Sequence, residues 1–413
     1  MTPGVDCLQE SSHHLTFLPM EKLVVISGQR TPFGAFGGSL KDLSATELGT
    51  LSAVAAMKQA GVSPEKIDHV VFGNVVPSSA DAAYLPRHIG LKSGVPVAIG
   101  AYAVNRLCGS GFQSWVNAAQ MILTGEASMV LAGGVEQMSQ IPYVARKVRF
   151  DGMRMGNFEL EDSMTSALTD AYAGLPMAMT AENLGEKYGI SREQCDEYSI
   201  LTQSRYKTAL EKGFFATEIS PVTITTKKGE TTVSKDEDPK PDVTLEKVRA
   251  MKPLFKKDGL VTAATASGIV DGAACSLITT EAKAKTLGLK PRARILSYAS
   301  VGCDPKIMGI GPAGAIRAAL AKASLELSQM DLIEVNEAFA AQFLAVQKEL
   351  SLPGERTNVN GGAIAVGHPL GASGTRIMNH LVYELERRQG RYAVGSACIG
   401  GGQGIAIVIE RFI

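Results

Sequence analysis

The pentapeptide Leu107-Cys108-Gly109-Ser110-Gly111 recurs 263 residues later in the chain as Leu370-Gly371-Ala372-Ser373-Gly374. Each copy stands directly before a run of residues with helical periodicity, so each is expected to form the turn between a strand and a helix. A strand–turn–helix unit that recurs at a fixed offset indicates a chain built from two copies of one half.

Positions upstream of the pentapeptide share the offset, because Asp68 then aligns with Asp331. Downstream, a slip of two residues is needed to place Ala132-Gly133 opposite Ala397-Cys398. We therefore predict a duplication that covers strand, turn and helix, with a small length difference near its end.

Strands and helices alternate along the first copy. Residues 23–27 form the first credible strand, residues 45–60 have a helical pattern between the N-cap Ser44 and Gly61, and residues 128–132 form an apolar strand that is expected to end at Gly133-Gly134. This alternation predicts an α/β fold with a largely buried sheet.

Composition excludes several classes of function. A chain of 413 residues is long enough for two to three domains, and its 41 Lys and Arg balance 41 Asp and Glu. No net charge therefore attracts a nucleic acid or an anionic membrane. The six cysteines are scattered and are expected to be free thiols, and the uncharged stretch 393–409 contains too many glycines for a membrane span.

The organisation predicted for the chain has three parts. Residues 1–21 form a leader or tail, residues 22–288 an N-terminal half, and residues 289–413 a C-terminal half. The N-terminal half includes an inserted loop domain over 136–268, in which helices are expected at 180–187 and 191–212. Its lysines suggest either a solvated face or a site for a phosphorylated ligand.

Three residues carry candidate chemistry. Cys108 stands before a helix N-terminus between small neighbours, which favours a reactive thiolate, although a buried structural cysteine is the alternative. His368 lies in the equivalent turn of the second half and is suited to proton transfer. Cys398 precedes three glycines whose free amides suit an oxyanion hole. A zinc site is disfavoured because no short ligand pair exists, and no bound metal is expected.

Four segments then identify a family. NRLCGSGFQS (105–114), VNEAFAAQ (335–342), NGGAIAVGHPLGASG (360–374) and CIGGGQG (398–404) resemble, in chain order, the signature motifs of the thiolase family. The resemblance extends from about residue 23 to the C-terminus. It implies a thiolase fold, in which two duplicated βαβαβαββ halves stack as five α-β-α-β-α layers and carry an inserted loop domain.

The resemblance also implies a covalent acyltransferase mechanism. Cys108 would accept the acyl group, His368 would remove its proton, and Cys398 would act as acid and base at the α-carbon. Asn336 would hold a water in one oxyanion hole with His368, and Glu337 follows it in the same motif. The amides of Cys108 and Gly400 would form the second oxyanion hole.

Coenzyme A is the implied substrate, and no permanently bound cofactor is expected. The residues that the resemblance places along the pantetheine tunnel are Met177, Ala263, Ser267, Met308 and Phe339, and Lys240 is the implied partner of the nucleotide phosphates. The implied partners are CoA and acyl-CoA, with no nucleic acid and no membrane span. The resemblance further implies a homodimer or homotetramer.

The intervening sequence is most similar to the degradative branch of the family, which cleaves 3-ketoacyl-CoA in fatty acid β-oxidation. The biosynthetic acetoacetyl-CoA branch has a histidine where this chain has Pro176, so broader acyl chains are expected here. Acetoacetyl-CoA thiolysis remains the alternative activity. A non-catalytic CoA-binding protein and a decarboxylating ketosynthase are disfavoured by the intact set of Cys108, His368 and Cys398.

Two observations on location point in different directions. The body of the chain is similar to mitochondrial-type enzymes, whereas the leader has no arginine and contains Asp6 and Glu10, which does not suit a mitochondrial presequence. Leu8 with His14-Leu15 resembles an N-terminal peroxisomal signal, except that Cys7 replaces its leading basic residue. A mitochondrial location is favoured, with the peroxisome and the cytoplasm as alternatives. The remaining cysteines and histidines are expected to be structural or surface groups.

Overall fold

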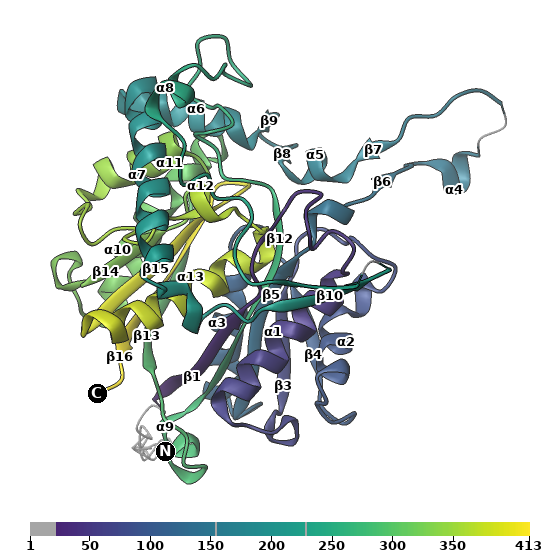
Figure 1. Cartoon of the computed structure of the whole chain (residues 1–413), viewed down its shortest axis with the longest axis vertical. Coiled ribbons are helices and arrows are strands. Elements are labelled where there is room, and N and C mark those ends of the chain that lie inside the picture. The colour runs from purple at the N-terminus through teal and green to yellow at the C-terminus, as the bar shows by residue number, and fades with distance from the viewer. Residues whose placement is uncertain (1–21, 153–154, 228) are drawn as a thin grey trace, which may run out of the picture.

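The computed structural model describes residues 22–152, 155–227 and 229–413, so the predicted leader lies outside the described residues. Its centre is a mixed sheet whose strands run in the order β14-β15-β16-β13-β1-β12-β5-β3-β4 (Figure 1). In chain order the bounds are β1 (Leu23–Arg30), β3 (His69–Gly73), β4 (Ala101–Val104), β5 (Met129–Glu136), β12 (Val270–Thr280), β13 (Ala293–Gly302), β14 (Leu332–Val335), β15 (Tyr392–Ile399) and β16 (Gln403–Arg411).

Helices cover both outer faces and fill the middle of the molecule. The outer helices are α1 (Ala45–Ala60) and α2 (Leu85–Lys92) on the first half, and α10 (Gly311–Ala323) and α11 (Ala340–Leu350) on the second. The central helices α3 (Ser110–Leu123) and α13 (Leu370–Arg388) pack on each other between the two halves.

Buried apolar side chains confirm the five predicted layers. One group joins α1 and α2 to the first half-sheet, another joins α10 and α11 to the second, and a third surrounds α3 and α13. In the third group Trp115 and Ile377 of the central helices meet Val130 and Ile405 from the two half-sheets. Burial of these apolar faces is the main stabilising contribution to the layered arrangement.

The duplication is confirmed in detail by two aspartates. The Asp68 carboxylate accepts hydrogen bonds from the amides of Ser128 and Met129, and that of Asp331 accepts them from Arg391 and Tyr392. All three pairs of equivalent residues are 263 positions apart. The parallel ladders agree, because His69 pairs with Val130 and Leu332 with Ala393. The predicted two-residue slip is therefore wrong, and the offset holds as far as β15.

Local sequence signals predicted the bounds of α1 correctly but not the end of β5. Ser44 caps α1 in a capping box with Glu47, and Gly61 ends it at φ 65°. The predicted end of β5 at Ala132 is wrong, because the strand continues through two glycines to Glu136. These glycines admit close neighbours: a Cβ on Gly134 would lie 1.9 Å from the Gly371 carbonyl oxygen.

The segment between β5 and β12 forms the inserted region. Its main helices are α6 (Met177–Tyr188), α7 (Arg192–Glu211) and α8 (Leu245–Arg249), which confirms the two helices expected there. Its other elements are β6 (Tyr143–Val144), α4 (Val148–Asp151), β7 (Glu161–Asp162), α5 (Ser163–Ala167), β8 (Thr169–Asp170), β9 (Leu175–Pro176), β10 (Val222–Thr226) and β11 (Gly229–Val233).

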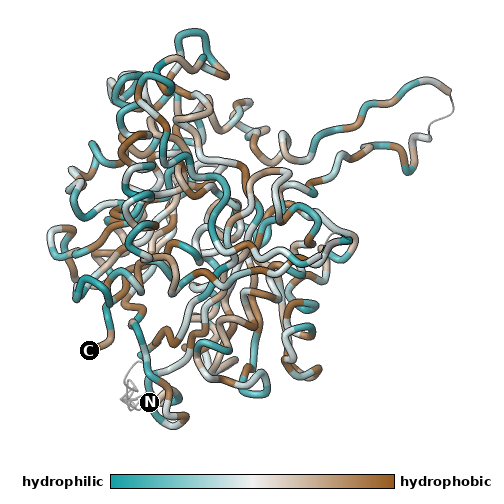
Figure 2. The backbone as a smooth tube through the Cα atoms, in the orientation of Figure 1, coloured by the Kyte–Doolittle hydropathy of each residue, from teal (hydrophilic) through white to brown (hydrophobic). Residues whose placement is uncertain are grey.

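Part of this region projects as an arm that carries β6, α4 and β7 (Figure 1). Hydrophobic residues appear on the arm as well as in the interior (Figure 2), and Tyr143, Phe150 and Phe158 are exposed there. No helix in the described ranges is long and apolar enough to cross a membrane. The boundaries predicted for the three parts of the chain remain predictions.

Candidate active site

Cys108 lies in the turn that leads into α3. Leu107 has a positive φ of 47°, and its amide donates to the Asn105 side chain at 3.0 Å, which closes the turn. The next position requires glycine, because a Cβ on Gly109 would lie 2.5 Å from the Ile399 side chain of the second half. The turn therefore places the half-buried Cys108 next to β15 and the loop after it.

The environment of the Cys108 sulfur is mainly apolar. Burial raises the pKa of the Cys108 thiol to about 11, although the amide N–H groups of Gly400 and Cys108 act in the opposite direction. The N–H groups around the sulfur thus favour the thiolate, as expected, but burial outweighs them in the resting site. A neighbouring base must accept the proton for the sulfur to react.

His368 is held through both ring nitrogens. Its Nδ1 lies 2.6 Å from Ser373 Oγ, and its Nε2 lies 3.3 Å from Asn336 Nδ2. Ser373 Oγ donates its own proton to the Pro369 carbonyl oxygen at 3.1 Å, so it accepts a proton from Nδ1. This assignment leaves a lone pair on Nε2. The imidazole is buried, which together with the charge of Arg376 lowers the pKa of His368 to about 3, so His368 is a neutral acceptor.

Asn336 and Glu337 follow strand β14 but have different surroundings. The backbone N–H of Asn336 donates to the Ser396 carbonyl oxygen at 2.9 Å, which fixes the residue. The Asn336 side chain contacts His368. The Glu337 carboxylate accepts hydrogen bonds from Tyr198 and Asn358 and from the Ile364 amide. Glu337 thus holds the segment that precedes His368, and its carboxylate contacts neither ring nitrogen.

Cys398 lies near the end of β15 in a closed apolar environment. It is fully buried with Met177, Met308 and Ala338, and Phe339 packs on the same group. Burial, followed by the nearby thiols of Cys108 and Cys303, raises the pKa of Cys398 well above its ordinary value. Cys398 therefore rests as a thiol that can donate a proton.

Gly400 begins the glycine run after Cys398. A Cβ at this position would lie 3.0 Å from Leu107 Cδ1 and 3.3 Å from Met177 Sδ. Gly401 and Gly402 both have φ near 80°, which favours glycine. The run thus lets a backbone amide face the Cys108 sulfur without an intervening side chain, as an oxyanion hole requires.

Two adjoining cavities lead to this group of residues. The inner one has a volume of about 380 Å³ and is lined by His368 together with four predicted tunnel residues, Met177, Ala263, Ser267 and Phe339. The outer one, of about 590 Å³, shares Ala263, Ala266 and Gly268 with it. Met308 lines neither cavity. Its side chain belongs instead to the apolar group around Cys398.

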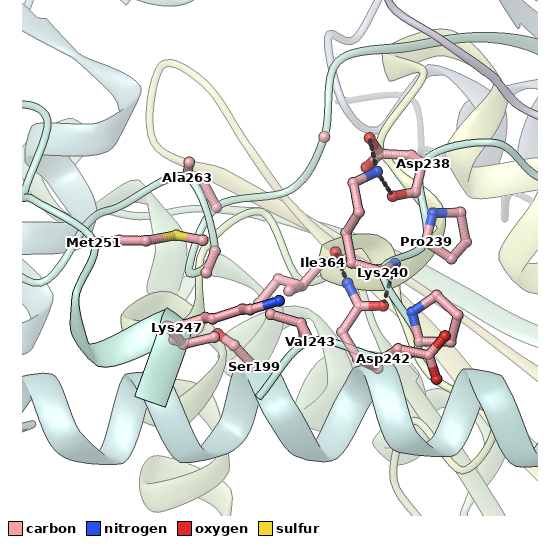
Figure 3. Close-up of a pocket in the computed structure, with 16 residues that line it drawn as sticks. Ser199, Asp238, Pro239, Lys240, Asp242, Val243, Lys247, Met251, Ala263 and Ile364 are labelled. Carbon is pink, nitrogen blue, oxygen red and sulfur yellow. Dashed lines mark hydrogen bonds and ion pairs between the residues drawn. The ribbon is translucent and has the colours of Figure 1, made fainter. Parts of the chain in front are cut away.

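Two cations of the inserted region, Lys240 and Lys247, line the outer cavity (Figure 3). The Lys240 ammonium lies against Asp238, 3.7 Å from its Oδ1, and donates to the Asp238 carbonyl oxygen. Lys247, in α8, extends along the same cavity and makes no ion pair within the described residues. Sequence reasoning missed Lys247. The local signals are its place among the lysines of the inserted region and the Thr244 cap of its short helix.

Glu136 is a second residue that sequence reasoning missed. Its buried carboxylate accepts from the amides of Val75 and Val76 and from that of Gly371 at the start of α13. Burial raises the pKa of Glu136 to about 7. Glu136 thus links the two halves of the molecule beside the site. The signal for it in the sequence was its position at the end of a glycine-containing strand.

Comparisons with known proteins agree with this geometry. Residues 23–282 match the family model described as the thiolase N-terminal domain, and residues 289–411 match the thiolase C-terminal domain. The chain belongs to the thiolase family. It is 56% identical to the mitochondrial 3-ketoacyl-CoA thiolase of Homo sapiens over 387 residues, which cover 94% of this chain and 97% of that thiolase.

Solved thiolase structures share the fold. The crystal structure of the human mitochondrial 3-ketoacyl-CoA thiolase in complex with CoA has a TM-score of 0.92 and 54% identity, with 95% of this chain and 98% of that chain covered. The acetyl-CoA acetyltransferase of Bacillus anthracis has a TM-score of 0.93 and 43% identity, with 95% and 99% covered. The family and the thiolase fold predicted from the motifs are thus confirmed, and the roles of individual site residues stay predictions.

Proposed function

We propose that this chain is a 3-ketoacyl-CoA thiolase of fatty acid β-oxidation, which cleaves 3-ketoacyl-CoA with CoA to acetyl-CoA and a shortened acyl-CoA. The observation that carries this proposal is the juxtaposition of the Cys108 sulfur, the Gly400 amide and the buried Cys398 thiol, with His368 lining the adjoining inner cavity. The identity with the human enzyme supports the same reaction.

The geometry suits a two-stage acyl transfer. The lone pair of His368 Nε2 accepts the Cys108 proton, and the resulting thiolate attacks the 3-keto carbon. The bond between C2 and C3 then breaks, and Cys398 protonates the departing acetyl-CoA enolate. In the second stage the Cys398 thiolate takes the thiol proton of free CoA, and the resulting CoA thiolate attacks the acyl-Cys108 thioester. The departing Cys108 thiolate recovers its proton from His368, so both cysteines return to their resting thiols. The amides of Gly400 and Cys108 stabilise one oxyanion, and Asn336 with His368 the other.

The inner cavity supports acyl groups longer than acetoacetyl. Pro176 lines it together with Met138, Leu168 and Leu370, and its walls are predominantly apolar. Apolar walls stabilise each added methylene of an acyl chain by about 0.8 kcal/mol. We therefore include medium acyl chains among the substrates.

The partner and location follow from the same relatives. Free CoA and acyl-CoA are the substrates, and the chain needs no permanently bound cofactor for this chemistry. A mitochondrial location is supported by the human relative, whose name places it in the mitochondrion. We further propose a homodimer or homotetramer as the assembly.

Chain-length dependence tests the proposed function. Purified protein is supplied with 3-ketoacyl-CoA esters of four to sixteen carbons and free CoA, and acetyl-CoA release is measured. Cleavage of substrates longer than four carbons is the expected result. Activity confined to the four-carbon ester would instead assign acetoacetyl-CoA thiolysis, and no cleavage at any length would overturn the thiolase activity.

A further inference from the structure

A buried ion pair lies between α13 and β14, directly behind the proposed site. Arg376 Nη1 donates to Glu334 Oε1, and the two side chains are only 4% and 3% exposed. Arg376 Nε and Nη2 are also buried, and no described residue accepts a hydrogen bond from them. Glu334 thus compensates the guanidinium charge on one side only. Because the surroundings are buried and have a low dielectric constant, this charge acts over a longer distance than it would in water.

The same two elements hold His368 and Asn336. Glu334 is two residues before Asn336, so both side chains lie on one face of the strand. Arg376 is three residues after Ser373, so both lie on one face of the helix. Ser373 and Asn336 are the two side chains that hold the ring of His368. The ion pair therefore fastens the elements that orient this ring, one helical turn further along α13.

The elements next to the site each carry a titratable or charged group. The turn before α3 supplies Cys108, β15 supplies Cys398, β5 supplies Glu136 through the Gly371 amide, and β14 supplies Glu334. The first two are thiols at rest. After burial, the charge of Arg376 is the remaining cause that lowers the pKa of His368.

We propose that Arg376 is a positioning residue that keeps His368 neutral, both by its positive charge, which Glu334 compensates on one side only, and by fastening α13 to β14 through Glu334. The proposal rests on the proposed function, because it assigns His368 as the base for Cys108. A buried ion pair of this kind is weak support for stability alone, since apolar residues of similar size often replace such pairs without loss.

The first experiment needs no substrate. The rate at which iodoacetamide alkylates Cys108 is measured by peptide mass spectrometry between pH 5 and pH 9, for wild type, R376Q and R376K. Without the guanidinium charge, His368 accepts the Cys108 proton more readily, so R376Q should alkylate faster at neutral pH. The expected gain is on the order of tenfold, which corresponds to a rise of one unit in the pKa of His368. R376K should stay near wild type.

Matched variants separate charge from packing. Arg388→Gln removes a cation from the same helix, at a side chain that is 41% exposed, and should leave the alkylation profile unchanged. If R376Q does not fold, the double variant E334L/R376M removes both charges while filling the space. A smaller gain in the same direction is expected from it, because the opposing charge of Glu334 is lost as well. An alkylation rate equal to or below wild type in the folded charge-removed variant would overturn the proposal.

Acyl transfer gives the second readout. In single-turnover acylation of Cys108, the acid limb of the pH profile should move to higher pH in R376Q and not in R388Q. A profile that is lowered but unshifted would indicate a structural role only and would overturn the proposal. If wild type formed no acyl-enzyme, the proposed function would fail, whereas the alkylation result would still decide the role of Arg376.

Discussion

Gly111 and Gly374 contact each other's helices with no side chain between them. A Cβ on Gly111 would lie 2.6 Å from the Thr375 amide nitrogen, and one on Gly374 would lie 2.2 Å from that of Phe112. The two contacts are equivalent under the 263-residue repeat, so α3 and α13 cross at the local two-fold axis of the duplication. This close crossing brings the turns with Cys108 and His368 to the same end of the central layer.

Gly374→Ala should therefore destabilise the fold, because the methyl group meets backbone that cannot move aside without separating α3 from α13. We expect a loss of about 2 kcal/mol or more in the free energy of unfolding, measured by chemical denaturation. Gly354→Ala is the control, since a Cβ there finds its nearest neighbour 3.9 Å away in a side chain. Equal stability of the two variants would contradict the tight crossing.

Substitution of the two cysteines should separate their roles. Cys108→Ser should abolish acyl-enzyme formation, because a serine hydroxyl is a far weaker nucleophile beside a neutral imidazole. Cys398→Ser should still form acyl-Cys108 from an acyl-CoA donor while losing thiolysis by a factor on the order of 10² to 10⁴, the usual contribution of a general acid. Mass spectrometry of tryptic peptides locates the acyl group, and its presence on Cys398 in wild type would reverse the assignment.

Lys247 should contribute more to CoA binding than Lys240. The Lys240 ammonium already lies against Asp238, whereas Lys247 makes no ion pair in the described part of the chain. We expect Lys247→Ala to raise KM for CoA by about fivefold at low salt, equivalent to ~1 kcal/mol, and Lys240→Ala to have a smaller effect. Steady-state kinetics at two salt concentrations test this order, and the reverse order would restore Lys240 as the main phosphate contact.

The stability contributed by His380 should fall as pH rises. Burial opposes protonation of this ring, yet Glu218, 2.8 Å from Nδ1, raises the pKa of His380 above 6.5. A raised pKa adds stability that is complete below pH 6.5 and is lost as the pH passes through the higher value of the folded state. His380→Gln should thus cost more at pH 6 than at pH 9 in urea unfolding. A cost independent of pH would mean that the ring is neutral throughout.

The sequence predicted those parts of the molecule that depend on local pattern. Repeated turns located Cys108 and His368, and capping residues located α1. Contacts between distant elements had no such signal. Lys247, Glu136 and Arg376 matter because of what the fold places beside them, and Met308 turns toward Cys398 instead of toward the cavities. The two-residue slip predicted near Ala132 is wrong because glycines there indicate the end of a strand. In the structure these glycines lie within β5, at the positions where neighbouring backbone comes closest.

The repeat also shows which residues stand in the other half at the positions equivalent to the proposed site. The counterparts of Cys108, Asn336 and Cys398 in the other half are Gly371, Gly73 and Val135. A Cβ on Gly371 would lie 2.7 Å from the Val135 carbonyl oxygen and 2.8 Å from that of Gly73. At the position equivalent to Cys108, backbone therefore occupies the space that a side chain would need. Cys108 and its proposed partners His368 and Cys398 thus come from different halves of the repeat, so the proposed chemistry needs both halves.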